Sequence, residues 1–194
     1  MMNYEEIKGN IKVRMLNAGR EVKGIIRPAD DYGFEGLILT PIIEVGETEE
    51  GFATIPITEE VIELLGVTED EIYAKGIENI KYTIKTLKEV MIGMMFPDGL
   101  PEEMEDDLFP DMSIYVVSNE ENFYGAAAAI AATSELIKKF PEGYIVLPSS
   151  IHEVIVVPKG IGDTEYLNDM VKEINAGVVS EKDRLSDDIY EFTE

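Results

Sequence analysis

The chain has 194 residues, and its 40 acidic against 16 basic residues give a formal net charge of −24. Such a charge repels nucleic acid and anionic lipid, so we expect neither as a direct partner. The absence of cysteine excludes disulfides, thiolate chemistry and cysteine-bound zinc, which fits a cytoplasmic protein.

The hydrophobic content of 45% is that of a globular protein. The first ten residues, MMNYEEIKGN, are acidic and lack an apolar run, so we expect no signal peptide. No apolar stretch approaches the length of a membrane span, and we therefore expect no membrane partner.

The first part of the chain predicts a hairpin followed by helices. Apolar and basic residues alternate in Ile11–Met15, and residues 22–26 read as the returning strand. Thr58 is a suitable N-cap for a short helix. Thr68 and Glu71 form a capping-box pattern, and apolar residues at steps of three to five predict one long helix from there to Met91.

Residues 96–111 contain three prolines and a dense run of acids, which predicts an exposed loop. We expect an acidic interaction surface there, made of Glu102, Glu103, Glu105, Asp106 and Asp107. The acids could attract a divalent cation, but their spacing matches no EF-hand loop, so we predict no metal site and no cofactor.

The second part predicts a strand at 113–117, an alanine-rich helix at 125–139, a hairpin at 144–157 and a helix from Asp163 or Thr164. The hairpin runs, YIVL and VIVV, are continuously apolar, which is typical of a central position in a sheet. We expect Val146 and Ile155 to be buried together beneath the alanine-rich helix.

These elements predict an α+β fold, with a mainly antiparallel sheet and helices packed on it. We expect a single domain over residues 1–194. An alternative within it is two lobes, 1–95 and 112–194, joined by the acidic segment 96–111.

The hairpin turn holds the cluster that most invites a chemical interpretation: Ser149, Ser150, His152 and Glu153, with the only histidine of the chain. A serine beside a histidine and a carboxylate suggests a hydrolase. Neighbouring strand residues point to opposite faces, however, and the chain has no Gly-x-Ser-x-Gly motif. Side chains that bond the turn's own backbone are the simpler reading.

Three segments carry a resemblance: YVVSNEENFYGAAAAI, YIVLPSSIHEVIVVP and MVKEINAGVVSEKDRLSDDIYEF. Over residues 85–194 the chain resembles an uncharacterised bacterial family, from gut anaerobes and their mobile elements, known only as a domain of unknown function. The GVTEDEIYAKGIENI segment is similar to another uncharacterised bacterial group. The resemblance implies no activity, cofactor or catalytic residue.

Two classes of function remain from the sequence. The charge and the lack of a convergent catalytic set favour a non-enzymatic protein-interaction protein, whose partner presents a basic surface. The alternative is an anti-defence or regulatory protein that mimics nucleic acid and occupies a basic groove. A hydrolase that uses Ser150 and His152 is a weaker alternative.

Overall fold

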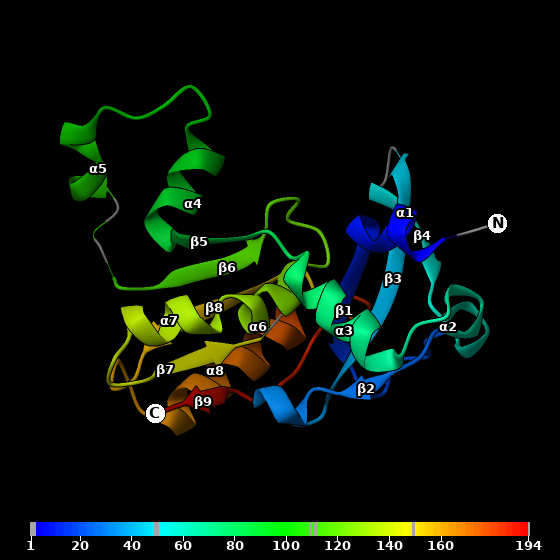
Figure 1. The fold of residues 1–194 in the computed structure, drawn as a ribbon. Helices are drawn as coiled ribbons and strands as arrows, with labels where there is room; N and C mark the ends of the chain where they lie inside the picture. Colours follow the sequence, from blue (N-terminus) through cyan, green and yellow to red (C-terminus); the bar gives the residue numbers. More distant parts are fainter. Residues whose placement is uncertain (1–2, 49–50, 109, 111, 149, 194) are drawn as a thin grey trace.

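The computed structural model describes residues 3–48, 51–108, 110, 112–148 and 150–193. The fold is α+β, as the sequence predicts, with two antiparallel sheets and helices packed against them (Figure 1).

The elements of the first part of the chain are α1 (Tyr4–Ile7), the 3-10 turn η1 (Lys8–Asn10), β1 (Ile11–Asn17), β2 (Arg27–Pro28), η2 (Asp30–Tyr32), β3 (Leu37–Thr48), β4 (Gly51–Pro56), α2 (Glu59–Leu65) and α3 (Glu69–Glu78). The remaining elements are β5 (Tyr82–Thr86), α4 (Leu87–Met95), α5 (Glu102–Leu108), β6 (Tyr115–Asn119), η3 (Gly125–Ala127), α6 (Ala128–Ala131), α7 (Thr133–Lys139), β7 (Tyr144–Leu147), β8 (Glu153–Pro158), α8 (Thr164–Gly177) and β9 (Tyr190–Phe192).

Sheet A is formed by the N-terminal strands, in the order β1-β3-β2, with β4 also paired to β3. The predicted alternation in β1 is confirmed: Ile11, Val13 and Met15 are buried, whereas the two basic residues between them are half-buried. Helix α3 lies against β1 at Gly76, where a Cβ atom would meet Val13 and backbone of β1. Helix α3 therefore packs closely on the apolar face of β1 at this position.

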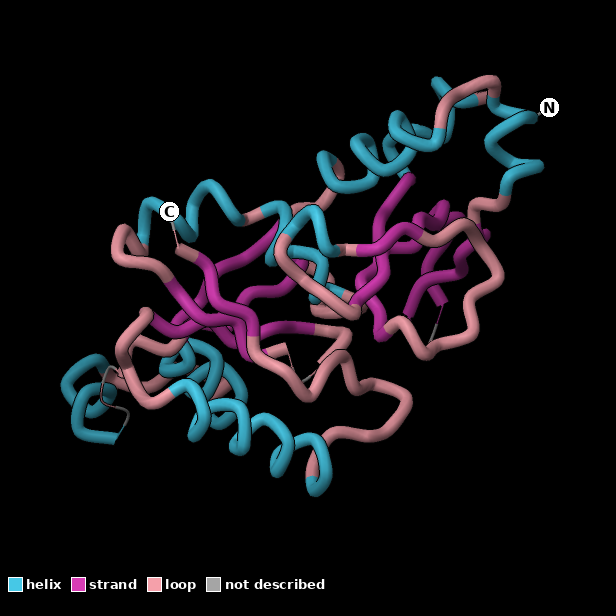
Figure 2. The backbone as a smooth tube through the Cα atoms, turned by 90° about the horizontal axis from the view of Figure 1, so that it is seen from below, coloured by secondary structure: helices cyan, strands magenta, loops and turns pink. Residues whose placement is uncertain are grey.

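Sheet B has the order β5-β6-β8-β7-β9. Strands β7 and β8 form the predicted hairpin, with Val146 opposite Val156 and Leu147 opposite Ile155. Helices lie on both sides of this sheet (Figure 2). The hairpin is central, as its apolar runs predict.

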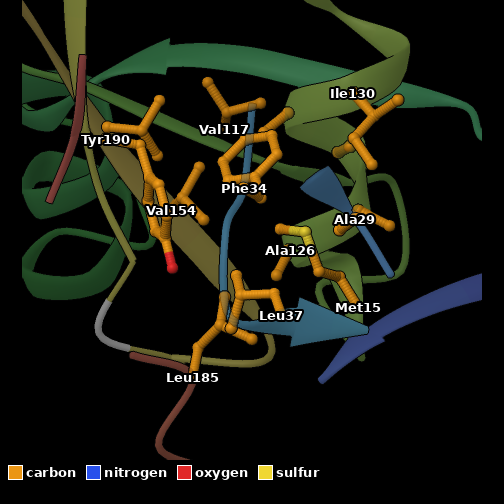
Figure 3. Close-up of a cluster of buried hydrophobic side chains, with 14 of the residues drawn as sticks. Met15, Ala29, Phe34, Leu37, Val117, Ala126, Ile130, Val154, Leu185 and Tyr190 are labelled. Carbon is orange, nitrogen blue, oxygen red and sulfur yellow. The ribbon is translucent and has the colours of Figure 1, made fainter. Parts of the chain in front are cut away.

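The main core lies between the two sheets and the alanine-rich segment (Figure 3). Met15 and Leu37 of sheet A, Val117 and Val154 of sheet B, and Ala126 all belong to one cluster of buried side chains. Their small and branched side chains let three layers approach closely. Because this core is shared, the two sheets are packed as one unit.

Two predicted elements of the first part are wrong. Residues 22–26 are not the return strand of a hairpin, because β1 pairs with β3 along its whole length. Gly24 instead lies against the backbone of Ile57. A Cβ atom added to Gly24 would lie 2.8 Å from the carbonyl oxygen of Ile57. The predicted long helix does not continue to Met91. Helix α3 ends at Glu78, with Asn79 as its C-cap, and the residues of β5 pair with β6 instead.

The alanine-rich helix is broken into η3, α6 and α7, and only part of its predicted relation to the hairpin is confirmed. Val146 is fully buried in the main core with Ala127. Ile155 is only half-buried and lies on the other face of sheet B, because it alternates with Val154 and Val156.

The predicted loop at 96–111 contains the helix α5. β5 before this segment and β6 after it are neighbours in sheet B. The change from sheet A to sheet B falls between β4 and β5. In Figure 1, α4 and α5 extend beyond the edge of sheet B formed by β5.

Candidate functional site

The hairpin turn is organised around His152, whose contacts are structural. The Oγ atom of Ser150 accepts a hydrogen bond from the backbone N–H of His152 at 3.0 Å, and Ser118 donates its hydroxyl to the carbonyl of His152 at 2.8 Å. The predicted local bonding of the turn is thus confirmed for Ser150. Ser149 lies outside the described residues.

The His152 ring is held by groups from two other segments. Its Nδ1 atom accepts the backbone N–H of Tyr124 at 3.2 Å, and its Nε2 atom lies 3.6 Å from Oδ1 of Asp183. A hydrogen bond from the Ser180 hydroxyl, with a smaller contribution from His152, keeps the pKa of Asp183 below its ordinary value. The sequence did not point to Tyr124 or Asp183.

This geometry does not bring the predicted hydrolase residues together. Nδ1 is occupied by the Tyr124 amide, and Nε2 faces Asp183 rather than a serine hydroxyl. Glu153 lies in β8 and lines a groove on the other face of sheet B. A nucleophilic serine requires a base within hydrogen-bond reach, and the described contacts of Ser150 do not supply one.

The predicted acidic surface lies on α5 and adjoins α4. Glu103 and Asp106 are exposed, and Asp106 and Glu105 lie 2.5 and 3.7 Å from Nζ of Lys88 in α4. Glu102 and Asp107 also belong to α5. The ion pairs with Lys88 join the two short helices and leave Glu103 exposed to solvent.

Beside these acids lies an exposed apolar surface that sequence analysis did not identify. We call it the methionine surface, and it comprises Met94, Met95, Met104, Leu108 and Met112. Each of these side chains is at least half exposed, and Met94 is 79% exposed. Isolated apolar residues on a surface are ordinary, but five exposed ones within 19 consecutive residues are an unusual concentration of apolar side chains.

Helix α4 is the unusual element of this region. Its sequence, LKEVMIGMM, is mostly apolar, yet it contains no buried residue. Thr86 and Glu89 form a capping box at its start, so the helix is well defined without a complete packing partner. An apolar helix in water normally lies against a core, and α4 does so only in part.

A groove runs between α4 and sheet B, and we call it the α4 groove. It has a volume of about 600 Å³. Val90 and Met94 line its α4 side, whereas Val116 and Ile155 lie on the sheet. Helix α8 packs on Ile145, Leu147 and Val157 of the same sheet face, and so leaves β5, β6 and the start of β8 to form the groove.

The charge around this region is strongly negative. Residues 89–137 contain no lysine or arginine, and residues 89–112 contain eight acids and five of the nine methionines of the chain. Among the residues that the structure describes, no group of three or more acids or histidines is arranged to hold a metal ion. In the same part of the chain, no helix is both long and apolar enough to cross a bilayer.

The comparison with family models decides the classification, since one model matches residues 1–194 and is described as a family of unknown function. The chain belongs to DUF5688. The match also includes residues 1–84, which precede the range of the sequence resemblance. No curated protein and no solved structure matches the chain.

Membership of DUF5688 assigns no residue a role, so the candidate site depends on geometry alone. One sequence signal could have found it, namely the concentration of methionine among the acids of residues 89–112. The acids drew attention to this segment, but the exposure of its methionines depends on the position of α4 in the fold.

Proposed function

We propose that this protein binds another protein through the α4 groove and the methionine surface, and that the bound element is a basic amphipathic helix. The observation that carries the proposal is α4 itself, an apolar helix without a buried residue. A bound helix would cover the apolar side chains that the chain leaves in contact with water.

The shape and the side chains of the region suit such a ligand. Helices dock in grooves through apolar residues at positions i, i+3 or i+4, and i+7, and about 300–1,000 Å³ is a usual size for a binding pocket. The groove volume of about 600 Å³ therefore fits a few anchoring side chains. Methionine is flexible and polarisable, so it adapts to partners of different shape.

The negative charge of the region favours a partner with a positively charged surface. Glu103 and Asp98 are exposed in the same stretch of chain as the methionine surface, and the α4 groove is lined by Glu89, Glu153 and one cation, Lys85. Lys88 is already paired with Asp106. An acidic surface of this kind accelerates association with a basic partner and discriminates against acidic ones.

Mimicry of nucleic acid is the alternative and would use the acids alone. It needs no methionine, and the pairing of Lys88 with Glu105 and Asp106 neutralises part of the acidic surface. The two functions therefore differ in whether the apolar side chains contribute to binding.

The direct test is NMR of protein labelled with ¹³C at its methionine methyl groups. A lysine-rich peptide with leucines at i, i+3 and i+7 is titrated, with a peptide of the same composition in scrambled order as the control. We expect shifts for Met94, Met95 and Met104, whereas Met15, which is fully buried in the main core, stays unchanged.

Two sets of variants separate apolar from electrostatic binding. We expect Met94→Ser with Met95→Ser to weaken binding about tenfold or more, since removing apolar anchors costs roughly 1–2 kcal/mol each. The matched control is Val178→Ser, which changes a side chain that is 82% exposed at the end of α8. Equal binding of the ordered and scrambled peptides would contradict the proposal.

The charge variants are Asp98→Asn and Glu103→Gln, with Glu173→Gln on the exposed side of α8 as the control. We expect the first two to slow association and reduce its salt dependence, and the control to leave both unchanged. Loss of binding in these variants together with full binding in the methionine variants would favour mimicry.

A further inference from the structure

A second cavity lies on sheet A and shares no lining residue with the α4 groove. Its volume is about 280 Å³. Arg14 of β1 and Thr40 of β3 are cross-strand partners and both line it. Residues 20–23 and Tyr124 also line it, so the cavity lies where sheet A meets the segment that leads into η3.

Two residues that line this cavity each carry a buried polar atom without a hydrogen-bond partner. Among the described residues, three buried side-chain polar atoms lack a hydrogen-bond partner, and two of them are Nη1 of Arg20 and Oγ1 of Thr40. Thr40 is only 3% exposed. A buried polar group without a partner costs about 1–3 kcal/mol, so a ligand that accepted a hydrogen bond from either residue would recover that energy.

The charge of the lining is opposite to that of the protein. Arg14, Arg20 and Lys23 line the cavity, and Glu21 is the only acid among its lining residues. In the described part of the chain, none of these three cations lies within 4.0 Å of a carboxylate oxygen. Acids outnumber bases by 40 to 16, so cations that are clustered and unpaired require an explanation.

The contacts of Arg14 fix its guanidinium without neutralising it. Its Nη2 atom donates to Oγ1 of Thr54 at 3.3 Å, and its Cζ lies 4.1 Å from the centre of the Tyr124 ring. Burial lowers the pKa of Arg14, and the nearby Glu44 partly opposes that effect. An arginine whose guanidinium lies over an aromatic ring keeps other N–H groups free to donate.

We infer that this cavity binds a phosphate group of a small molecule. The cations come from two segments, Arg14 from β1 and Arg20 and Lys23 from the segment after it, and Thr40 of β3 lines the cavity beside them. A tetrahedral phosphate accepts hydrogen bonds from several directions, whereas a planar carboxylate is satisfied by one bidentate arginine. The arrangement therefore fits phosphate better than carboxylate.

The test is calorimetric titration of the full chain with inorganic phosphate, and with acetate for comparison, at an ionic strength held constant with sodium chloride. We expect saturable binding of phosphate, and a melting temperature that rises with its concentration because the ligand binds only the folded state. No heat and no change in melting temperature with phosphate would overturn the inference. Equal or tighter binding of acetate would overturn it as well.

Thr40→Val tests the unsatisfied hydroxyl without changing the shape of the side chain. We expect the melting temperature without phosphate to stay the same or rise, because a buried polar atom without a partner is removed. The affinity for phosphate should fall at the same time. A variant that is destabilised and binds phosphate as the original chain does would show that the hydroxyl serves the fold and not the ligand.

Arg20→Gln tests the charge, and Lys138→Gln is its control, since Lys138 is exposed on α7 and carries the same charge. We expect Arg20→Gln to weaken phosphate binding about tenfold or more, because a hydrogen bond to a charged group is worth roughly 1.5–3 kcal/mol. Lys138→Gln should bind phosphate as before. An equal loss in both variants would mean that only the net charge matters, and would overturn the site.

Discussion

The backbone N–H of Tyr124 donates to Nδ1 of His152 across 3.2 Å and so ties the segment before η3 to the turn before β8. Tyr124 has a positive φ of 51°, a conformation that costs energy for any residue with a side chain. Because Nδ1 accepts this hydrogen bond, the N–H group of the ring is at Nε2, which lies 3.6 Å from Oδ1 of Asp183.

We expect His152→Ala to reduce the free energy of unfolding by about 1–2 kcal/mol, since the half-buried Tyr124 amide loses its acceptor. His152→Asn is the control, because its side-chain oxygen can replace Nδ1 as an acceptor. Urea unfolding of the two variants measures the difference. An alanine variant as stable as the original chain would contradict the structural role of the ring.

Truncation to alanine should destabilise the protein more at Val156 than at Ile155, although isoleucine is the larger side chain. Val156 is fully buried in the main core, whereas Ile155 is half-buried beside the α4 groove. We expect Val156→Ala to cost on the order of 2 kcal/mol, from lost transfer energy and a cavity, and Ile155→Ala to cost less. Thermal or urea unfolding tests this order, and a larger loss for Ile155→Ala would mean that the groove is closed in solution.

Gly125 and Gly93 form a matched pair for the effect of an added methyl group. A Cβ atom at Gly125 would meet Oγ of Ser118, the carbonyl oxygen of His152 at 2.5 Å and the backbone nitrogen of Asn119 at 2.7 Å. We expect Gly125→Ala to cost about 3 kcal/mol or more, because backbone atoms cannot give way cheaply.

Gly93 lies in α4, and a Cβ atom there would meet nothing within 4 Å. Gly93→Ala should therefore stabilise the protein by about 0.5–1 kcal/mol, the usual preference for alanine in a helix. Chemical unfolding measures the change in stability for Gly125→Ala and for Gly93→Ala, which we expect to be opposite in sign. A destabilised Gly93→Ala would show that α4 is not helical in solution.

Glu44 should make stability depend on pH in the direction opposite to most carboxylates. Burial raises its pKa above the ordinary glutamate value, against the attraction of Lys12 and Arg14. The folded state then binds the proton more tightly than the unfolded state. Its contribution to stability is fully present below the unfolded pKa, and is lost as the pH rises through the folded pKa.

We therefore expect Glu44→Gln to be more stable than the original chain at neutral pH, with a difference that shrinks as the pH falls toward the ordinary glutamate value. The exposed Glu173→Gln is the control and should show no such trend. Melting temperatures across this pH range measure it. A difference that grows toward acid pH would mean that the attraction of Lys12 and Arg14 outweighs burial.

The sequence by itself determined the elements that depend on neighbouring residues. The apolar runs around Pro148 and Ser150 specified the β7–β8 hairpin, and Thr58, Thr68 and Asp163 cap helices where predicted. Each of these depends on interactions between residues only a few positions apart, so the local pattern contains the needed information. The α+β class follows from the order of such elements.

Only the tertiary structure decided which surfaces are buried and which strands are neighbours. The pattern of residues 22–26 suits a strand, but β3 is longer and more apolar and takes the place beside β1. The apolar steps from Ile72 to Met91 suit one helix, but the β-branched residues of β5 gain more from pairing with β6, far along the chain. The same long-range packing leaves α4 partly uncovered and brings Arg14, Arg20 and Thr40 around one cavity. A sequence pattern records which residues prefer burial, whereas the choice among competing partners depends on the free energy of the whole fold.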